Sequence, residues 1–334
     1  MMKKIAIVKL SAMGDIIHAM VAVQFIKKRL PNIKIDWFVE ESFFKVLEFN
    51  PQIDNIYKVN LKKLKRNKLA LFEQIKLIKR YSKNDYDLVI DAQGLIKSAL
   101  VSKLLGKKIA GFSKDSIREK FASNFYNIKV DIAYDQNTID RNVKILTYPL
   151  NIDVSSDDIL KKEAFLFFKN EDEKIYDFLS KDKKNIILVI GSTWESRNYP
   201  KEKYLEIANA LKENCIIVWG TEKEKENAYF IEENSPYSKV MMKCDLNSLK
   251  ALISKCDLLI GNDTGPTHMA WGLNIPSITI FGPTPINRVY KTPINAVVKS
   301  NSIINHYKLD KNDFSIREID ENTIIKKAKS LLNG

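Results

Sequence analysis

The sequence predicts an α/β protein built from two doubly wound parallel sheets, that is, two Rossmann-like domains facing across a cleft. Short apolar runs of the length of buried strands alternate with amphipathic stretches of helical period along most of the chain. With 334 residues, the chain is long enough for two domains. Because residues 151–163 are strongly polar, we expect the connection nearby and assign the domains to 1–160 and 161–334.

The first half opens with a β–α–β pattern. Residues 4–10 (KIAIVKL) form an apolar strand, residues 16–30 an amphipathic helix that ends at Pro31, and residues 33–39 a second strand. Residues 61–81 form a basic amphipathic helix. Its lysines either face solvent while the apolar stripe packs on the core, or they lie on an anionic membrane. Strands follow at 86–91 and 108–112, with a turn and helix (AQGLIKSALVSKLLG) between them.

The second half alternates more regularly. We predict strands at 185–190, 215–219, 240–242, 258–260 and 277–281, and helices after Pro200, at 222–234, at 247–255 and from about 266. A last helix at 321–332 completes the chain. The sequence leaves its packing partner open, and it could pack back on the first domain.

Charge is distributed unevenly between the halves. Residues 1–150 hold 28 Lys and Arg against 15 Asp and Glu, whereas residues 151–334 hold 26 of each. A basic first half suits nucleic acid, an anionic membrane surface or a polyanionic substrate. No apolar run is long enough to span a membrane, and three cysteines without C-x-x-C spacing indicate buried thiols in a reducing compartment. The start of the chain is typical of a first strand in a cytoplasmic protein.

Four polar loops follow predicted strands: SAMGD at 11–15, DAQG at 91–94, GSTWESRN at 191–198 and GNDTGPTH at 261–268. Loops at the carboxyl ends of parallel strands share one edge of a sheet, which is where open α/β sheets bind ligands. The last loop leads into a helix, so its free N–H groups can bind a phosphate. An ordinary turn with a capping side chain remains the alternative.

Several side chains in these loops suit particular roles. Asp15 can act as a general base or cap its own helix. Arg197, beside Ser192 and Thr193, can bind a phosphate or lie in solvent. Glu224 lies where an acid often holds a ribose, or it is a surface charge, and His268 can reach a phosphate or cap its helix.

No motif predicts a metal or a cofactor. The three histidines are scattered, and the sequence has no D-x-D pair and no Walker or G-x-S-x-G motif. A nucleotide diphosphate would therefore be neutralised by N–H groups and Arg197.

The combination of motifs resembles the lipopolysaccharide heptosyltransferases of glycosyltransferase family 9, over nearly the whole chain. The segments that carry the resemblance include IVKLSAMGDIIHAM, VIDAQGLIKSAL, REKFASNFYN, NDTGPTHMA and IFGPT. The DAQGLIKS segment is similar to the corresponding segment of the type I enzymes of this family. The resemblance implies a GT-B architecture and a metal-independent, inverting transfer of L-glycero-D-manno-heptose from ADP-heptose to the inner Kdo of Kdo-lipid A. It also implies that the enzyme acts at the cytoplasmic face of the inner membrane, on its anionic surface.

The resemblance also implies roles for particular residues. Asp15 would be the catalytic base. The donor would be bound by Ser192, Thr193, Arg197, Glu224, Asp263, Thr264, Gly265 and His268, with Asp263 near the sugar. The acceptor would be bound by Gly14, Gln93, Gly94, Arg118 and Lys120. Two departures stand out, since the family has a lysine at the position of Arg197 and a threonine at that of Ser192.

Two alternatives stay open. One is a related enzyme of the same family, similar to heptosyltransferase II or using another sugar donor. The other is a basic nucleic-acid-binding α/β protein, suggested by the charge and the lysine-rich segment. Because the chain contains no recognised nucleic-acid module, we do not expect nucleic acid among its partners.

Overall fold

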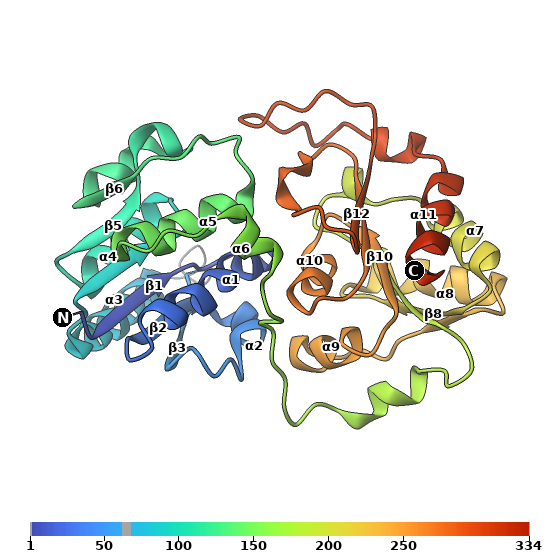
Figure 1. Ribbon diagram of the computed structural model, residues 1–334, viewed down its shortest axis with the longest axis horizontal. Helices are drawn as coiled ribbons and strands as arrows, with labels where there is room; N and C mark the ends of the chain where they lie inside the picture. The colour runs from blue at the N-terminus through green and yellow to red at the C-terminus, as the bar shows by residue number, and fades with distance from the viewer. Residues whose placement is uncertain (1, 62–67, 334) are drawn as a thin grey trace. The chain divides into compact units, whose positions relative to one another are not determined.

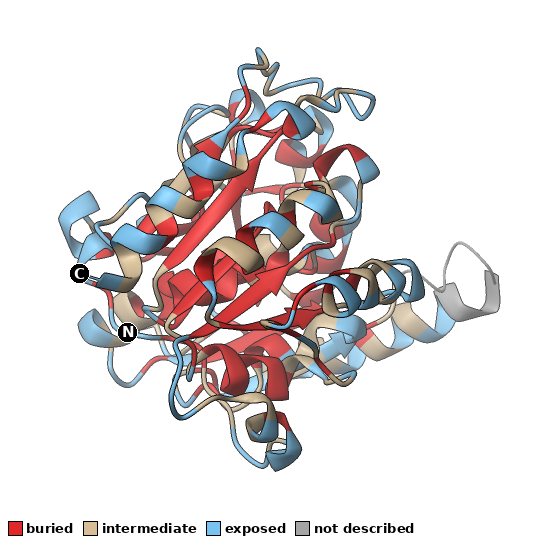
Figure 2. Ribbon diagram, turned by 90° about the vertical axis from the view of Figure 1, so that its right-hand side faces the viewer, coloured by how far each residue is buried: buried red, intermediate tan, exposed pale blue. Residues whose placement is uncertain are grey.

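The computed structural model describes the backbone of residues 2–61 and 68–333, and the side chains of these residues except 68–71. The chain divides into two compact units, Met1–Phe165 and Leu166–Gly334, five residues after the boundary that the sequence suggested. Each unit contains one parallel sheet covered by helices (Figure 1). Figure 2 shows the same arrangement by burial, with buried strands and exposed outer faces on the helices.

The first unit is built on a six-stranded parallel sheet in the order β3-β2-β1-β4-β5-β6. Its strands are β1 (Lys4–Val8), β2 (Lys34–Glu40), β3 (Asn55–Val59), β4 (Leu88–Asp91), β5 (Ile109–Phe112) and β6 (Ile128–Val130). The chain turns back at the centre of this sheet, where β1 pairs with both β2 and β4. This strand order is the one found in dinucleotide-binding sheets, and the reversal between β1 and β4 is where such sheets bind ligands.

Helices cover both faces of this sheet. They are α1 (Met13–Arg29), α2 (Phe44–Leu47), α3 (Lys68–Tyr81), α4 (Ile96–Leu105), α5 (Thr138–Thr147) and α6 (Ser156–Leu160). Helix α1 packs against α5, and α3 packs against α4. The described part of the predicted basic helix begins at Lys68. Its lysine-rich start, with Lys62, Lys63, Lys65 and Arg66, lies outside the described residues.

The second unit repeats the plan, with the order β12-β11-β10-β7-β8-β9. Its strands are β7 (Asn185–Val189), β8 (Asn214–Val218), β9 (Ser238–Val240), β10 (Leu258–Asn262), β11 (Ser277–Phe281) and β12 (Asn295–Lys299). Its helices are α7 (Lys201–Leu211), α8 (Glu222–Asn234), α9 (Leu246–Ile253), α10 (Gly265–Gly272) and α11 (Glu321–Asn333). Here the order reverses between β7 and β10, which pair with each other.

The last helix belongs to the second unit. Ile324 and Ala328 of α11 are fully buried in the same core as Ile186 and Leu258, and α11 packs on α7. This helix is therefore held by the core of the second unit. Its apolar stripe completes the layer that covers β10, β11 and β12.

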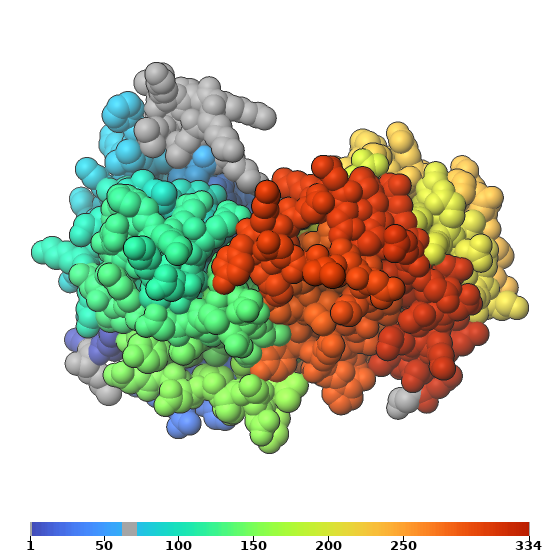
Figure 3. All heavy atoms as spheres, turned by 90° about the horizontal axis from the view of Figure 1, so that it is seen from above, coloured from blue at the N-terminus to red at the C-terminus, as the bar shows by residue number. Residues whose placement is uncertain are grey.

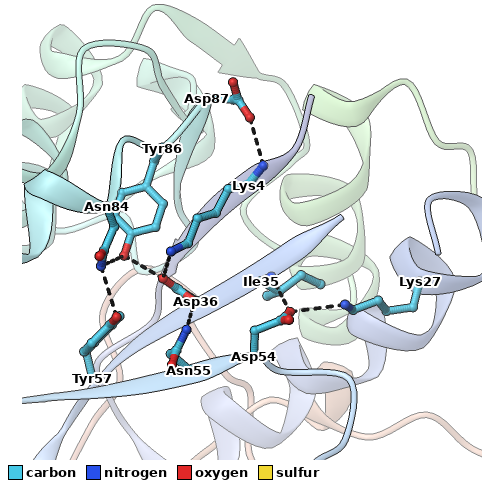
Figure 4. A network of polar contacts seen from close by, with 10 residues as sticks. All are labelled: Lys4, Lys27, Ile35, Asp36, Asp54, Asn55, Tyr57, Asn84, Tyr86 and Asp87. Carbon is cyan, nitrogen blue, oxygen red and sulfur yellow. Dashed lines mark hydrogen bonds and ion pairs between the residues drawn. The ribbon is translucent and has the colours of Figure 1, made fainter. Parts of the chain in front are cut away.

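The amino end of the first sheet holds a polar network, drawn in Figure 4. Asp36 is fully buried, pairs with Lys4 (Nζ–Oδ2 3.0 Å), and accepts hydrogen bonds from Tyr86 (2.9 Å) and Asn55 (2.8 Å). Burial, together with the Asp36 charge, raises the pKa of the Tyr86 hydroxyl far above its usual value. These bonds join β1, β2 and β3 at the edge opposite the loops that carry the candidate site.

The cysteines are free thiols, as the sequence predicted: Cys215 and Cys256 are buried and Cys244 is partly buried. Burial raises the pKa of Cys215 to about 12 and that of Cys244 to about 11, so neither is a reactive thiolate at neutral pH. Within the described residues, no helix is both long and apolar enough to cross a membrane.

Candidate active site

The candidate residues lie in loops at the sheet reversals. In the first unit, SAMGD follows β1 and DAQG follows β4; in the second unit, GSTWESRN follows β7 and NDTGPTH follows β10. These four strands are the central pairs β1–β4 and β7–β10. Each unit thus presents two of the predicted loops side by side at the carboxyl edge of its own sheet.

Asp15 lies in the first turn of α1 and is partly exposed. Its Oδ2 accepts a hydrogen bond from the backbone N–H of Ala12 at 3.3 Å. Gly14 precedes it in the same turn. The carboxylate therefore helps to cap its own helix while remaining accessible to solvent, so both sequence interpretations fit its position.

The loop after β4 supports the loop after β1. Gln93 Oε1 accepts hydrogen bonds from the backbone N–H groups of Leu10 and Ser11, both at 3.0 Å. Gly94 adopts a left-handed φ of +69°, and a Cβ there would lie 2.9 Å from Ile117. Because its side-chain oxygen is engaged with backbone, Gln93 fixes the position of the SAMGD loop, a role that the sequence did not suggest.

Asp91, the last residue of β4, holds the DAQG loop in place from the interior of the unit. Its fully buried carboxylate accepts hydrogen bonds from Gly94 N (3.1 Å), Ser98 Oγ (2.9 Å) and Tyr126 Oη (2.8 Å). Burial raises the pKa of this carboxyl, although the hydrogen bonds oppose the shift. Asp91 therefore organises the loop from within the fold.

Lys9 also lies at this site, although the sequence analysis did not predict it. Its ammonium is buried and donates to Ala92 O at 2.8 Å. Burial lowers the pKa of Lys9, while the nearby carboxylates of Asp15 and Asp91 act in the opposite direction. A lysine inside an otherwise apolar strand was the signal in the sequence, because an unpaired charge is expensive to bury.

Arg118 and Lys120 lie beyond β5 and are exposed. Lys120 pairs with Asp115 at 3.6 Å, and both side chains are mostly in solvent. Arg141 of α5 supports this segment, because its guanidinium donates to Ser116 O (2.7 Å) and Ala133 O (2.6 Å). Arg118 and Lys120 are thus exposed cations on a segment that Arg141 holds in place.

In the second unit, Asp263 is the centre of the candidate site. Only 2% of the residue is exposed. One carboxylate oxygen lies 3.0 Å from His268 Nε2. The other accepts a hydrogen bond from Thr284 Oγ1 at 2.8 Å and lies 3.6 Å from Arg197 Nη1. Asp263 therefore orients an imidazole and a guanidinium from two different loops.

The electrostatics of Asp263 follow from this geometry. Burial alone would raise its pKa, but the hydrogen bond from His268 and the charges of Arg288 and Arg197 hold the pKa well below its usual range. Thr284 and Arg288 come from the loop after β11, to which the sequence analysis gave no role beyond listing IFGPT among the segments that carry the resemblance. They are the residues of this cluster that it missed.

Helix α10 begins two residues after Asp263. Thr264 is its N-cap, has an extended backbone and makes no side-chain capping bond, while Gly265 is the first helical residue. Below them, Thr267 Oγ1 donates to Asn262 O at 2.7 Å, and Asn262 Oδ1 accepts from Tyr199 N at 3.1 Å. The start of the helix is thus held rigidly and has the dipole expected of an anion-binding terminus.

The loop after β7 brings Arg197 to this cluster. Arg197 is buried and donates to Thr193 Oγ1 at 3.3 Å, and its guanidinium lies 5.1 Å from the Trp194 ring centroid. The Ser192 hydroxyl donates to Trp194 O at 2.9 Å. The interpretation of Arg197 as a solvated surface charge is therefore wrong, because the side chain is directed inward by Asp263 and Thr193.

Glu224 lies in the first turn of α8 and forms a capping box with Thr221. Its Oε2 accepts a hydrogen bond from Gly220 N at 2.7 Å. The carboxyl group lies against Gly191, two residues after β7, where a Cβ would come within 2.1 Å of Glu224 Cδ. Gly191 therefore makes the space that places this acid beside the loop of Arg197.

No group of three or more His, Cys, Asp or Glu side chains arranged to hold a metal ion occurs in the described part of the chain.

The profile of glycosyltransferase family 9 (heptosyltransferase) matches residues 74–317. The chain is 40% identical to lipopolysaccharide heptosyltransferase 1 of Campylobacter coli, an alignment that covers 98% of each chain. This chain belongs to glycosyltransferase family 9. The resemblance read from the sequence is thereby confirmed.

Other members of family 9 give a consistent picture. Lipopolysaccharide heptosyltransferase 1 of Escherichia coli K12 is 28% identical over 84% of this chain and 88% of its own. The solved structure of the E. coli heptosyltransferase WaaC with ADP-2-deoxy-2-fluoro heptose has a TM-score of 0.79 at 23% identity, covering 98% of this chain and 99% of that one. The fold is therefore GT-B, as predicted, and the chain is a glycosyltransferase of the heptosyltransferase class. Family membership favours this assignment over the nucleic-acid-binding alternative.

Proposed function

We propose that this protein transfers L-glycero-D-manno-heptose from ADP-heptose to the inner Kdo of Kdo-lipid A, with inversion and without a metal ion. The observation that carries the proposal is the cluster of Asp263, Arg197 and His268 at the start of α10. Such a cluster suits a sugar diphosphate. The 40% identity to a protein named lipopolysaccharide heptosyltransferase 1 supports the choice of sugar and of lipid.

In this proposal the second unit binds the donor. The N–H groups near Thr264 and Gly265 and the guanidinium of Arg197 neutralise the diphosphate. The Glu224 carboxylate binds the ribose hydroxyls, and Ser192 and Thr193 complete the phosphate loop. Since Asp263 already binds His268 and Thr284, its main task is to hold these side chains and Arg197 in place. A contact with a heptose hydroxyl is a second role.

The first unit binds the acceptor and supplies the base. Asp15 removes the proton from the attacking Kdo hydroxyl while the new bond forms between that oxygen and the anomeric carbon. The bond from the anomeric carbon to the diphosphate oxygen breaks at the same time, and its electron pair leaves with ADP. Positive charge develops on the sugar, as in other glycosyl transfers. Gln93 and Gly94 hold the loop of Asp15, and Arg118 and Lys120 attract the anionic acceptor.

The Kdo carboxylates and lipid A phosphates explain the asymmetric charge. All the excess of positive charge lies in residues 1–150, the part assigned to the acceptor. The enzyme would act as a cytoplasmic protein bound peripherally to the inner membrane, whose anionic lipids attract the same basic unit.

An Asp15→Asn variant tests the mechanism. Removing a general base typically costs about 10²- to 10⁴-fold in turnover, while the binding of ADP-heptose to the second unit should stay within twofold. ADP release with Kdo-lipid A measures turnover, and calorimetry measures donor binding. Asp115→Asn, which alters an exposed carboxylate of the same unit, is the matched control. Wild-type turnover of the Asp15 variant would remove this residue from the mechanism.

The donor and acceptor are tested separately. ADP-heptose is compared with ADP-glucose and UDP-linked sugars, and Kdo-lipid A with an acceptor that already carries one heptose. Preference for the heptose-bearing acceptor would indicate instead a family member similar to heptosyltransferase II.

A further inference from the structure

Exposed apolar side chains gather on one helical layer of the first unit. Phe72 of α3 (70% exposed), Ile96 (38%) and Leu100 (48%) of α4, and Phe121 (61%) of the 3-10 segment Lys120–Phe125 all project from it. Helix α4 packs against both α3 and the 120–125 segment, so these side chains belong to one continuous layer. We call this set the apolar face. In Figure 3 the residues of α4 and of the 120–125 segment fall in the cyan to green range of the colour bar.

The position of the apolar face follows from the topology. A helix that follows a parallel strand begins at the carboxyl edge of the sheet and runs back along it. Phe72 lies near the start of α3, and Ile96 is the first residue of α4, three positions after Gln93. Phe121 lies next to Lys120 in the segment after β5. The apolar face therefore borders the same edge of the sheet as Asp15, Gln93 and Arg118.

Local contacts keep the face in place. Ile96 N donates to Glu119 Oε2 at 2.8 Å, which joins the start of α4 to the segment that carries Phe121. The Phe121 and Phe125 rings pack edge to face with centroids 5.8 Å apart. The exposed rings are therefore presented by an ordered surface.

Positive charge surrounds the face. Residues 72–81, 96–105 and 114–125 together contain eight Lys and Arg against three Asp and Glu. Glu119, one of the three acids, bonds to the start of α4, and Asp115 pairs with Lys120. Apolar tips within a basic border are complementary to an anionic bilayer, in which acyl chains lie beneath negative headgroups.

We propose that the apolar face docks this protein on the anionic bilayer surface, with Phe72, Leu100 and Phe121 entering the interface. The inference rests on the proposed function, because an acceptor anchored in the bilayer must reach the adjoining carboxyl edge of the sheet. Docking on this face presents that edge to the membrane. It assigns membrane contact to particular residues of α3, α4 and the 120–125 segment.

Vesicle binding tests the proposal directly. The full chain is sedimented with phosphatidylethanolamine–phosphatidylglycerol vesicles that contain no acceptor, and with phosphatidylcholine vesicles. The Leu100→Ser/Phe121→Ser variant should lose about tenfold in partitioning to the anionic vesicles. Lys97→Gln and Lys103→Gln should each lose about fivefold. The matched control is Tyr148→Ser/Leu160→Ser, which alters two comparably exposed side chains elsewhere in the same unit (52% and 47%) and should bind as the wild type does.

Turnover separates this inference from the proposed function. The apolar-face variant should retain wild-type turnover on a water-soluble, O-deacylated Kdo acceptor, and lose turnover on Kdo-lipid A in vesicles in proportion to its binding. If the wild type transfers heptose neither to the soluble acceptor nor to Kdo-lipid A, the proposed function fails, while the vesicle-binding measurement still tests the docking face. Equal binding of the apolar-face and control variants would overturn the docking proposal. A wild-type dimer that the Leu100→Ser/Phe121→Ser substitutions abolish would also overturn the proposal, because the apolar face would then bind a second copy of the chain.

Discussion

Replacing Asp263 by asparagine tests whether this carboxylate holds the second unit's site together. The substitution preserves size and removes one buried negative charge. In the wild type that charge lies 3.6 Å from Arg197 Nη1 and 3.0 Å from His268 Nε2, and the charge of Arg288 also acts on it. In the variant, Arg197 keeps its bond to Thr193 but faces a neutral amide.

The size of the effect follows from burial. Removing one partner of a buried ion pair typically costs about 3–5 kcal/mol, because the other charge is left without compensation. Asparagine retains an oxygen that can accept from Thr284, so we expect the lower end, about 3 kcal/mol. For a unit of this size, that loss lowers the melting temperature by roughly 6–12 °C. Glu222→Gln, which breaks an exposed pair with Lys225, should cost less than about 1 kcal/mol.

The pH dependence of the free energy of unfolding is a second test of the stabilisation by Asp263. Because the folded-state pKa of Asp263 is depressed, its stabilisation is fully present above the unfolded pKa, about 3.9. The stabilisation is lost as the pH falls below that value toward the folded pKa, since the unfolded chain takes up a proton that the folded one resists. The advantage of the wild type over Asp263→Asn should therefore be constant from about pH 7 to 5 and shrink below about pH 4.

Urea unfolding followed by hydrogen-exchange mass spectrometry measures this effect, because peptides from β7 and β10 report on the second unit separately. Equal stability of Asp263→Asn and Glu222→Gln would refute the reasoning. An advantage of the wild type that persists unchanged to pH 2.5 would also refute it.

Three further predictions concern other parts of the two units. Arg197→Lys should weaken ADP binding about tenfold by calorimetry, because one ammonium cannot serve Thr193, Asp263 and a phosphate together; unchanged affinity would place the diphosphate elsewhere. Gly191→Ala should displace Glu224 and weaken ADP binding, whereas Gly220→Ala, whose Cβ would lie 3.4 Å from Glu224, should be milder; equal affinities of the two variants would contradict this geometry. Asp36→Ala should cost the first unit about 3–5 kcal/mol by urea unfolding and leave turnover of the folded enzyme intact, since its network lies at the opposite sheet edge; a loss of turnover without a loss of stability would contradict that separation.

The strands that the sequence determined are chiefly those buried on both faces. Strands β1, β4, β7, β10 and β11 read as continuous apolar runs, because every side chain in the centre of such a sheet packs against a helix layer. The strands that the sequence analysis missed are β3, β6 and β12, and all three lie at sheet edges. An edge strand buries less of each residue, so its pattern depends on neighbours that only the folded chain provides.

The candidate site divides in the same way. The loops SAMGD, DAQG, GSTWESRN and NDTGPTH were identifiable from sequence, because turn residues and polar side chains follow apolar strands there. The contacts between side chains of different loops could not be identified from the sequence. Asp263 is joined to Arg197, 66 positions away, and to Thr284, while Gln93 supports Leu10 and Ser11 across the sheet reversal. The sequence by itself determined the sheet architecture and the loops that carry the chemistry, because burial and turn formation are local properties of the chain. Only the tertiary structure decided the partners of each charge, because strand order brings distant loops together.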